Sequence, residues 1–221
     1  MVHCGPRFMK NREHITSRYI FSRFAEICYR MTHPAHPWLT LKANRLLSDL
    51  LRPESVGIEF GSGRSTVWFA RKVTRLISVE HDKEWFDKVR ALLRRGNLGN
   101  VEYFCRNAAA APFSPQGYLS PLLKEPQNHF DFVLVDGLFR DLCAILAVKH
   151  VKVGGFIVID NVNWYLPSAS SSPNSRTSAD GPASYLWGKF LDSVREWKAQ
   201  WTTNGVSDTA FYFKPGKTTA L

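Results

Sequence analysis

The sequence predicts an α/β fold built on a mostly parallel sheet with helices on both faces. From about residue 53 onward, short apolar runs alternate with segments of helical spacing, and the links between them are short. Alternation of this kind is typical of parallel sheets with right-handed crossovers. Several of the runs are apolar throughout, as expected for strands that are covered on both faces. With 44% hydrophobic residues in a chain of 221, there is enough apolar surface to bury such a core.

Residues 1–52 are predicted to form a basic helical extension, followed by one domain over residues 53–221. The extension holds nine Lys and Arg against three Asp and Glu, a net charge of +6 within the +10 of the whole chain. Such a surface suits nucleic acid, an anionic membrane or an acidic substrate, and a solvated basic face is the alternative. Helical spacing over 15–31 and 39–51 predicts two helices. We expect the first to pack its apolar side on the domain, with an interfacial membrane helix as the alternative.

The elements of the domain are predicted in order along the chain. Strands are predicted at 56–60, 76–79, 101–105, 132–135 and 156–159, and helices at 65–72, 82–95, 138–150 and 184–198. Two further strand-like segments, 200–203 and 209–213, flank a loop that contains Asn-Gly, which is a hairpin signal. The sheet is therefore expected to end in an antiparallel pair.

Two stretches carry no regular pattern. Residues 112–129 contain four prolines and are expected to be irregular. Residues 166–183 are rich in Ser, Pro, Ala and Gly, and they follow the fifth strand on the side where open α/β sheets bind ligands. We interpret 166–183 as a mobile loop that covers a substrate, with a tolerated surface insertion as the alternative.

A glycine-spaced turn follows the first predicted strand and gives the first candidate site. Gly61 and Gly63 lack the side chains that would keep a ligand away from backbone N–H groups at a helix N-terminus. Glu80, 19 residues after Gly61, can accept hydrogen bonds from both hydroxyls of a ribose, which predicts a nucleoside-containing cofactor. A dinucleotide fingerprint would need a third glycine at Thr66, and the charge of Glu59 suits a cationic ligand better than a pyrophosphate. A nicotinamide-dependent oxidoreductase is thus the second hypothesis.

Polar residues stand at the carboxyl end of every predicted parallel strand. In chain order they are Glu59, Glu80, His81, Asp82, Arg106, Asn107, Asp136, Asp160 and Asn161. The carboxyl ends of parallel strands meet at one edge of a sheet, which is where open α/β sheets bind ligands. These side chains are therefore expected to form one site.

Four segments in this order resemble the class I S-adenosylmethionine-dependent methyltransferases. They are Glu-Phe-Gly-Ser-Gly-Arg-Ser, Ile-Ser-Val-Glu-His-Asp, Phe-Asp-Phe-Val-Leu-Val-Asp-Gly and Val-Gly-Gly-Phe-Ile-Val-Ile-Asp-Asn. The resemblance runs from about residue 51 to residue 213. It implies a Rossmann-like, seven-stranded sheet with a reversed last strand, and S-adenosylmethionine as the cofactor. It also implies that the methionine part is held by Glu59, Gly61, Ser62, Gly63 and Ser65, the ribose by Glu80 beside His81, the adenine by Asn107, and the junction with the substrate by Asp136.

A narrower similarity is to the catechol and caffeoyl-CoA type O-methyltransferases. It implies a divalent metal, Mg²⁺, on Asp136, Asp160 and Asn161, which would lower the pKa of a substrate hydroxyl. That family has a lysine at the position of Phe139, and the next residue, Arg140, cannot act as a base. In the alternative interpretation, Asp160 and Asn161 position the substrate directly, and Asp136 or Asp160 removes its proton.

The expected reaction is methyl transfer to a hydroxyl of a small molecule or glycan. Its catalytic residues would be Asp136, Asp160 and Asn161, with His33, His36 and His150 as further candidate bases. The fourth strand is not followed by the Asn/Asp-Pro-Pro-Tyr/Phe type of motif that accompanies a flipped base, which favours a small acceptor. A third hypothesis is a non-enzymatic adaptor that binds nucleic acid or membrane through the basic extension. Four cysteines without metal-ligand spacing, and no apolar leader or membrane span, predict a cytoplasmic protein.

Overall fold

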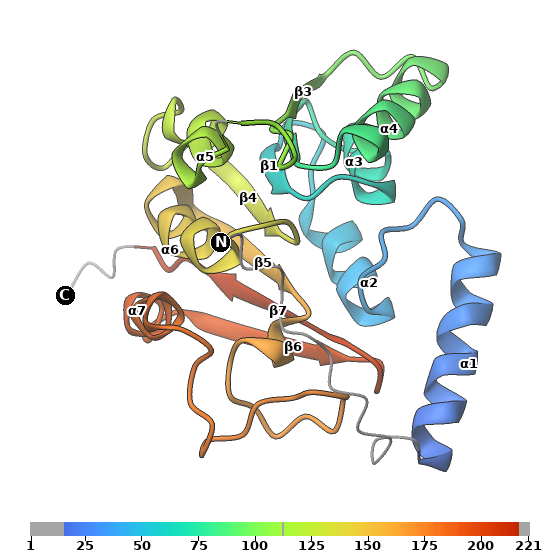
Figure 1. Cartoon of the computed structure of the whole chain (residues 1–221), viewed down its shortest axis with the longest axis vertical. Helices are drawn as coiled ribbons and strands as arrows, with labels where there is room; N and C mark the ends of the chain where they lie inside the picture. Colours follow the sequence, from blue (N-terminus) through green and yellow to red (C-terminus); the bar gives the residue numbers. More distant parts are fainter. Residues whose placement is uncertain (1–15, 112, 217–221) are drawn as a thin grey trace.

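The computed structural model contains one seven-stranded sheet and describes residues 16–111 and 113–216 (Figure 1). The strands are β1 (Val56–Phe60), β2 (Arg75–Glu80), β3 (Val101–Cys105), β4 (Phe130–Val135), β5 (Val151–Asp160), β6 (Lys198–Thr203) and β7 (Asp208–Phe213). Their order in the sheet is β3-β2-β1-β4-β5-β7-β6. Strands β1 to β5 pair in parallel, whereas β7 is antiparallel to both of its neighbours, β5 and β6. The predicted mostly parallel sheet with a reversed last strand is confirmed.

Helices connect the strands as the sequence pattern predicts, with shifted ends. They are α1 (Ser17–Thr32), α2 (Leu41–Leu50), α3 (Arg64–Ala70), α4 (Lys83–Arg95), α5 (Pro115–Leu123), α6 (Arg140–His150), the short 3-10 helix η2 (Val162–Trp164) and α7 (Tyr185–Ser193). The helix predicted at 184–198 ends early because residues from Lys198 onward pair with β7.

The prediction that residues 112–129 are irregular is wrong, because α5 lies within them. Ser114 caps this helix by accepting a hydrogen bond from Gly117 N, and a proline in the first turn costs no hydrogen bond. Pro121 has no N–H to donate to the carbonyl of Gly117, four residues earlier. Arg106 Nε and Ser120 Oγ donate to that carbonyl instead, each at 2.9 Å. Side chains thus replace the bond that the proline removes.

Each face of the sheet is covered by its own set of helices. Ile58 and Phe60 of β1 point to the face that α5, α6 and α7 cover, where Phe60 packs near Tyr118. Helices α2, α3 and α4 cover the opposite face, which contains the Phe132 ring. A Cβ at Gly57 would lie 2.1 Å from that ring, so the ring fills the space over the first strand. The central strands are buried on both faces, as predicted.

Helix α2 is part of the packed body although it precedes residue 53. Ala43 and Leu47 belong to the same apolar cluster as Phe69 of α3. The hydroxyl of Thr40, which caps α2, lies 2.6 Å from the hydroxyl of Thr202 in β6, in a buried contact. A boundary between an extension at 1–52 and a domain at 53–221 stays a prediction, and α2 contributes to the core from the N-terminal side of it.

Helix α1 forms as predicted, but the prediction of how it packs is wrong. Phe21 and Met31 are 73% and 75% exposed, so the apolar side of the helix faces away from the domain. The polar side faces the body instead, where Glu26 is 8% exposed and a Cβ at Gly205 would lie 2.6 Å from Ser22 Oγ. Helical periodicity shows which residues share a face, and it does not show which face is covered.

The loop at 166–183 is held to the body by polar contacts. Ser172 Oγ donates to Asp208 Oδ1 at 2.6 Å, and Asn163 Nδ2 donates to Pro173 O at 3.1 Å. Within the loop, the N–H of residue 168 donates to the carbonyl of Arg176 at 2.8 Å. This anchoring favours a fixed surface insertion over a mobile cover for a substrate.

Candidate functional site

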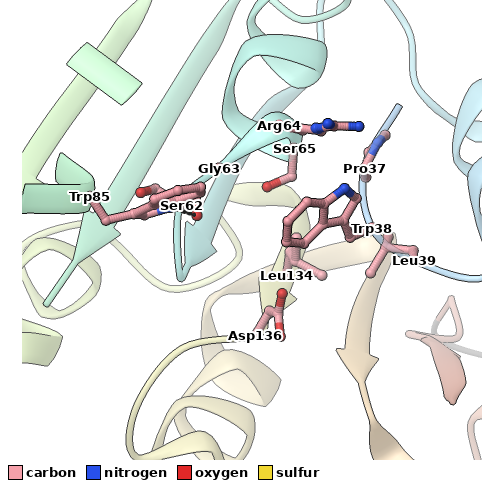
Figure 2. Close-up of a pocket in the computed structure, with 10 residues that line it drawn as sticks. All are labelled: Pro37, Trp38, Leu39, Ser62, Gly63, Arg64, Ser65, Trp85, Leu134 and Asp136. Atoms are coloured by element: carbon pink, nitrogen blue, oxygen red, sulfur yellow. Dashed lines mark hydrogen bonds between the residues drawn. The ribbon is translucent and has the colours of Figure 1, made fainter. Parts of the chain in front are cut away.

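Three pockets lie along the carboxyl edge of the sheet. The glycine-turn pocket (Figure 2) is lined by Pro37, Trp38, Leu39, Ser62, Gly63, Arg64, Ser65, Trp85, Leu134 and Asp136. The Asn107 pocket is lined by Cys105, Arg106, Asn107, Ala110, Ala111, Phe113, Ser114, Gly117 and Tyr118. The α1 pocket is lined by Arg23, Glu26, Arg30, Trp38, Asp136, Asp160, Asn161, Trp164, Val206 and Ser207. The first and third pockets adjoin, because they share Trp38 and Asp136.

These pockets contain most of the predicted site residues. The glycine-turn pocket contains Ser62, Gly63, Ser65 and Asp136, the Asn107 pocket contains Asn107, and the α1 pocket contains Asp136, Asp160 and Asn161. The remaining predicted residues line none of the three pockets: Glu59 and Glu80 are buried, Gly61 lies in the turn, and the His81 side chain is 34% exposed. The structure therefore separates residues that face the pockets from residues that hold the turn in place.

The loops after β1 and β4 are in direct backbone contact. Gly61 has a φ of +91°, and a Cβ there would lie 2.8 Å from the carbonyl carbon of Asp136. A Cβ at Gly137 would lie 2.1 Å from Tyr118 Oη and 2.8 Å from the backbone nitrogen of Gly61. Gly63 differs, because a Cβ there would meet one side chain at an ordinary distance of 3.8 Å. Gly61 and Gly137 thus allow two loops to approach, and Gly63 leaves space inside the pocket.

Glu80, the predicted ribose ligand, accepts hydrogen bonds from the turn and from its own strand end. Its Oε2 accepts from Ser62 N and Ser62 Oγ at 3.0 and 2.6 Å, and its Oε1 accepts from His81 N and Asp82 N at 2.7 and 2.8 Å. Burial by itself would raise the pKa of Glu80, but hydrogen bonds from the His81 side chain, Ser62 and the Asp82 backbone lower it to about 2. The group is therefore an ionised carboxylate at neutral pH and a strong acceptor.

Glu59 is fully buried behind the turn. Its Oε1 accepts hydrogen bonds from the hydroxyls of Thr66 and Ser78, and Thr66 Oγ1 accepts one from Gly63 N at 2.9 Å. Thr66 thus links the carboxyl group to the turn at the position where a dinucleotide fingerprint has glycine. The other carboxyl oxygen, Oε2, has no partner of good hydrogen-bond geometry among the described residues, although the Ser65 hydroxyl is close enough to lower the pKa of Glu59. Burial raises the pKa of Glu59 to about 7.

This raised pKa predicts that the protein loses stability as the pH rises from about 5 to about 8. The pKa of Glu59 is about 7 in the folded protein, against an ordinary value of 4.5. Between these two pH values the folded state keeps a proton that the unfolded state has lost, so the free energy of unfolding falls as the pH increases. The Glu59→Gln side chain cannot ionise, so the free energy of unfolding of this variant should fall by up to about 3 kcal/mol less. Urea unfolding of both proteins at the two pH values measures this, and an equal fall in the variant would contradict it.

Two aromatic residues that the sequence patterns did not single out hold the turn. Trp85, in the first turn of α4, donates from Nε1 to Ser62 O at 2.8 Å and lines the glycine-turn pocket. The hydroxyl of Tyr103 in β3 lies 2.6 Å from Ser62 Oγ. Trp85 had one sequence signal, since it follows the helix cap Asp82 by three residues. Tyr103 had none, because it lies inside a strand.

The Asn107 pocket has an aromatic wall next to a polar amide. The ring of Phe139 packs against Phe113 and Tyr118, with centroid distances of 5.7 and 5.8 Å. Phe139 has a left-handed backbone with a φ of +48°, which costs about 1–2 kcal/mol in a residue other than glycine. Where the O-methyltransferases have a lysine, this chain has Phe139, whose ring packs behind the two aromatic residues that line the pocket. Such a pocket suits a planar heterocycle.

Arg140 joins the carboxyl ends of β4 and β5. Its Nη2 donates to Asp136 O and Asp136 Oδ1, both at 2.8 Å. Its Nη1 donates to Asp160 O at 2.7 Å and to Asn161 Oδ1 at 3.3 Å, and its Nε donates to Gly137 O at 3.0 Å. The side chain is only 15% exposed. Arg140, which the sequence marks merely as unable to be a base, is the centre of this part of the site.

The residues predicted to bind Mg²⁺ do not fit a metal site. The Arg140 guanidinium occupies one oxygen of Asp136 and the side-chain oxygen of Asn161, and it supplies the positive charge there. Asp160 Oδ1 accepts a hydrogen bond from Thr209 Oγ1 at 2.7 Å. Over residues 16–111 and 113–216, no group of three or more His, Cys, Asp and Glu side chains could hold an ion. The Mg²⁺ prediction is therefore not supported.

Asp160 has a carboxyl group whose pKa is shifted toward neutrality. It is 5% exposed, and this burial, together with the negative charge of Asp136, raises the pKa of Asp160 above its ordinary value. The hydrogen bond from Thr209 and the charge of Arg140 oppose the shift without cancelling it. A carboxyl group with a pKa nearer to neutral is better suited to exchange a proton with a substrate at physiological pH.

The three candidate histidines lie away from these pockets. His36 Nδ1 is 2.6 Å from Tyr29 Oη, and the ring of His33 stacks on Tyr29 at 4.4 Å. His150 Nδ1 is 3.0 Å from Leu146 O within α6. Their partners are structural, and none of the three lines the glycine-turn, Asn107 or α1 pocket.

Comparisons with known proteins give structural matches. No protein-family model and no curated protein sequence matches this chain. A putative rRNA methylase from Clostridium thermocellum is similar, with 12% identity, a TM-score of 0.55 and coverage of 79% of this chain and 94% of its own. A methyltransferase from Geobacter sulfurreducens has 14% identity and a TM-score of 0.54 over 88% and 89% of the two chains. The cyclase SpnF has 11% identity and a TM-score of 0.50 over 79% and 80%.

At such identities, similarity establishes the fold and leaves the reaction open, as the cyclase among the matches illustrates. The methyltransferase matches cover 79% and 88% of this chain, so they include most of the seven-stranded sheet. The chain has the Rossmann-like, seven-stranded fold of the S-adenosylmethionine-dependent methyltransferases.

Proposed function

We propose that this protein transfers a methyl group from S-adenosylmethionine to a hydroxyl oxygen of a small molecule or glycan. The observation that best supports this function is the position of Asp136, which lines both the glycine-turn pocket and the α1 pocket. A cofactor in the first pocket and an acceptor in the second would meet at this residue. Methyl transfer needs that arrangement, since the acceptor oxygen must approach the methyl carbon in line with its bond to sulfur.

Each part of the cofactor has a matching surface. When bound, S-adenosylmethionine supplies an electrophilic methyl group on a positively charged sulfur. Ser62, Gly63 and Ser65 line the space for its methionine part, next to the carboxylate of Asp136. The ionised carboxylate of Glu80 lies directly behind Ser62, and it would accept a hydrogen bond from a ribose hydroxyl in exchange for the one that the Ser62 hydroxyl now donates. The Asn107 pocket would hold the adenine ring.

The nicotinamide-dependent oxidoreductase is the weaker candidate. The third glycine of a dinucleotide fingerprint allows the helix to approach the strand closely. Here Thr66 is fully buried at that position and bonds to both Glu59 and Gly63. The turn is thus built around a side chain that the dinucleotide geometry excludes.

The α1 pocket suits a ring that carries hydroxyl groups. Trp38 and Trp164 supply flat apolar surface, and the Arg30 guanidinium lies 5.0 Å from the Trp38 ring. Asp160 would accept the proton of the attacking hydroxyl, and Asn161 would position it. Nucleic acid is the alternative acceptor, supported by the net charge of +10 and by the similarity to an rRNA methylase.

The cofactor assignment predicts that S-adenosylhomocysteine stabilises the protein. At about 100 times the Kd, binding adds about 2.7 kcal/mol, or about 5–10 °C in the melting temperature. Glu80→Ala should lose most of that increase, because Ser62 and the ribose would both lose their acceptor. Glu84→Ala removes an exposed acid from the same region and should keep the full increase.

Differential scanning fluorimetry with S-adenosylhomocysteine, and separately with NADH, makes the measurement. Absence of any increase in the unmutated protein at saturating S-adenosylhomocysteine would reject the proposed cofactor. An increase with NADH alone would select the oxidoreductase instead.

The cysteines support a reducing location. Among the described residues, Cys28, Cys105 and Cys143 are free thiols, and such thiols persist in the cytoplasm. We therefore place the proposed activity there. In the described part of the chain, no helix combines the length and the hydropathy that a bilayer crossing requires.

A further inference from the structure

Helix α1 presents a continuous apolar stripe to solvent. The stripe consists of Ile20, Phe21, Phe24, Ile27 and Met31, which are 59%, 73%, 65%, 46% and 75% exposed. Four of its members follow each other at intervals of four, three and four residues, so they lie along one side of the helix. Scattered apolar side chains are normal on a surface, whereas an aligned set of this size marks a contact site.

The opposite side of α1 explains why this stripe is not turned inward. Glu26 is 8% exposed and pairs with both Arg23 and Arg30, and these three side chains line the α1 pocket. The helix therefore faces the domain with its charged residues. Figure 1 shows α1 at the margin of the molecule, beside α2.

We propose that α1 lies on the surface of an anionic membrane, with the apolar stripe inserted at the level of the lipid headgroups. A helix of 16 residues, about 24 Å long, with large apolar residues on one side and arginines on the other is typical of interfacial helices. Charge selects this partner over a second copy of the chain. The chain carries +10 and residues 1–52 carry +6 of it, so two copies repel each other while an anionic lipid surface attracts either one.

Vesicle co-sedimentation of the full chain tests the proposal. Vesicles of phosphatidylcholine with about 30% phosphatidylserine should retain the protein, and vesicles of phosphatidylcholine alone should retain much less. Phe21→Ser combined with Phe24→Ser should weaken binding at least about tenfold. Met31→Ser is a milder second variant on the same stripe. The matched control is Leu123→Ser, which removes a side chain that is 48% exposed at the end of α5, and it should bind as the unmutated chain does.

Circular dichroism and melting temperatures of all variants check that each one is folded. We expect no change in either, because the substituted side chains are exposed. Equal binding of the stripe variants and the unmutated chain, or no binding of the unmutated chain to anionic vesicles, would overturn the proposal. A dimer in light scattering that the stripe variants disperse, without vesicle binding, would assign the stripe to a second copy. Binding is measured without S-adenosylmethionine, so its outcome is independent of the proposed reaction.

Discussion

Replacing Arg140 with methionine is expected to lower the free energy of unfolding by about 3 kcal/mol, the lower end of the range for a buried pair because the Asp136 side chain is 38% exposed. The side chain donates five hydrogen bonds to groups at the ends of β4 and β5. Methionine fills a similar volume but leaves these acceptors, including the Asp136 carboxylate, without a donor or a positive charge. Urea unfolding at neutral pH measures the change.

Two further variants make the Arg140 result specific. Arg195→Met removes an arginine whose side chain is 72% exposed and whose ion pair with Asp192 spans 3.4 Å, so it should change stability by less than about 0.5 kcal/mol. Arg140→Lys keeps the charge and loses the planar fork, and it should fall between the unmutated protein and the methionine variant. Equal effects of methionine at 140 and 195 would show that the hydrogen bonds at the strand ends contribute little. If Mg²⁺ restored the stability of the methionine variant, this result would contradict the conclusion that Asp136 and Asp160 do not fit a metal site.

Gly137→Ala is expected to destabilise the fold by about 3 kcal/mol and to lower the melting temperature by about 6–12 °C. The new Cβ would lie 2.1 Å from Tyr118 Oη and 2.8 Å from the backbone nitrogen of Gly61. The tyrosine hydroxyl can shift, but the backbone of the first turn cannot retreat without moving away from β4. The same variant should therefore also lose the thermal response to S-adenosylhomocysteine.

Gly188→Ala is the matched control for this overpacking. A Cβ at Gly188 meets nothing within 4 Å, and the residue lies in α7. Alanine should raise stability there by about 0.5–1 kcal/mol, because glycine is a poor helix residue. Thermal melts of the two variants should thus move in opposite directions. A Gly137→Ala protein that melts like the unmutated chain would show that the two loops tolerate separation.

The sheet was predictable from sequence because its strands are buried on both faces. Burial of this kind requires short apolar runs such as Phe130–Val135, and such runs are visible in a single sequence. Helix α5 was not predictable by the same means, because the donors that replace the missing proline bond come from Arg106 and Ser120, and the arginine lies in the loop after β3. The packing of α1 was predicted wrongly for a related reason, since helical periodicity does not show which side of a helix contacts the rest of the protein.

The candidate site also has parts that the sequence predicts and parts that it does not. The glycine turn, Glu80 and the polar strand ends were predictable, because parallel strands bring their carboxyl ends to one edge. The lining supplied by Arg23, Glu26 and Arg30 was not, since these residues lie more than a hundred positions before Asp136 and reach it only through the placement of α1. The pairing of Arg140 with both strand ends could be inferred for Asp136, four residues away, but not for Asp160.

The position of β7 has a consequence for the order in which the molecule is assembled during synthesis. Residues 208–213 are the last strand of this sheet to be synthesised, yet they lie between β5 and β6. Until they emerge, β5 has an unpaired edge that can attach to other nascent chains, and Asp160 lacks the hydroxyl of Thr209. The half of the sheet that contains the glycine turn can form while translation continues. The half that contains Asp160 is completed only after residue 213 has been added, so the two halves of the candidate site mature at different times.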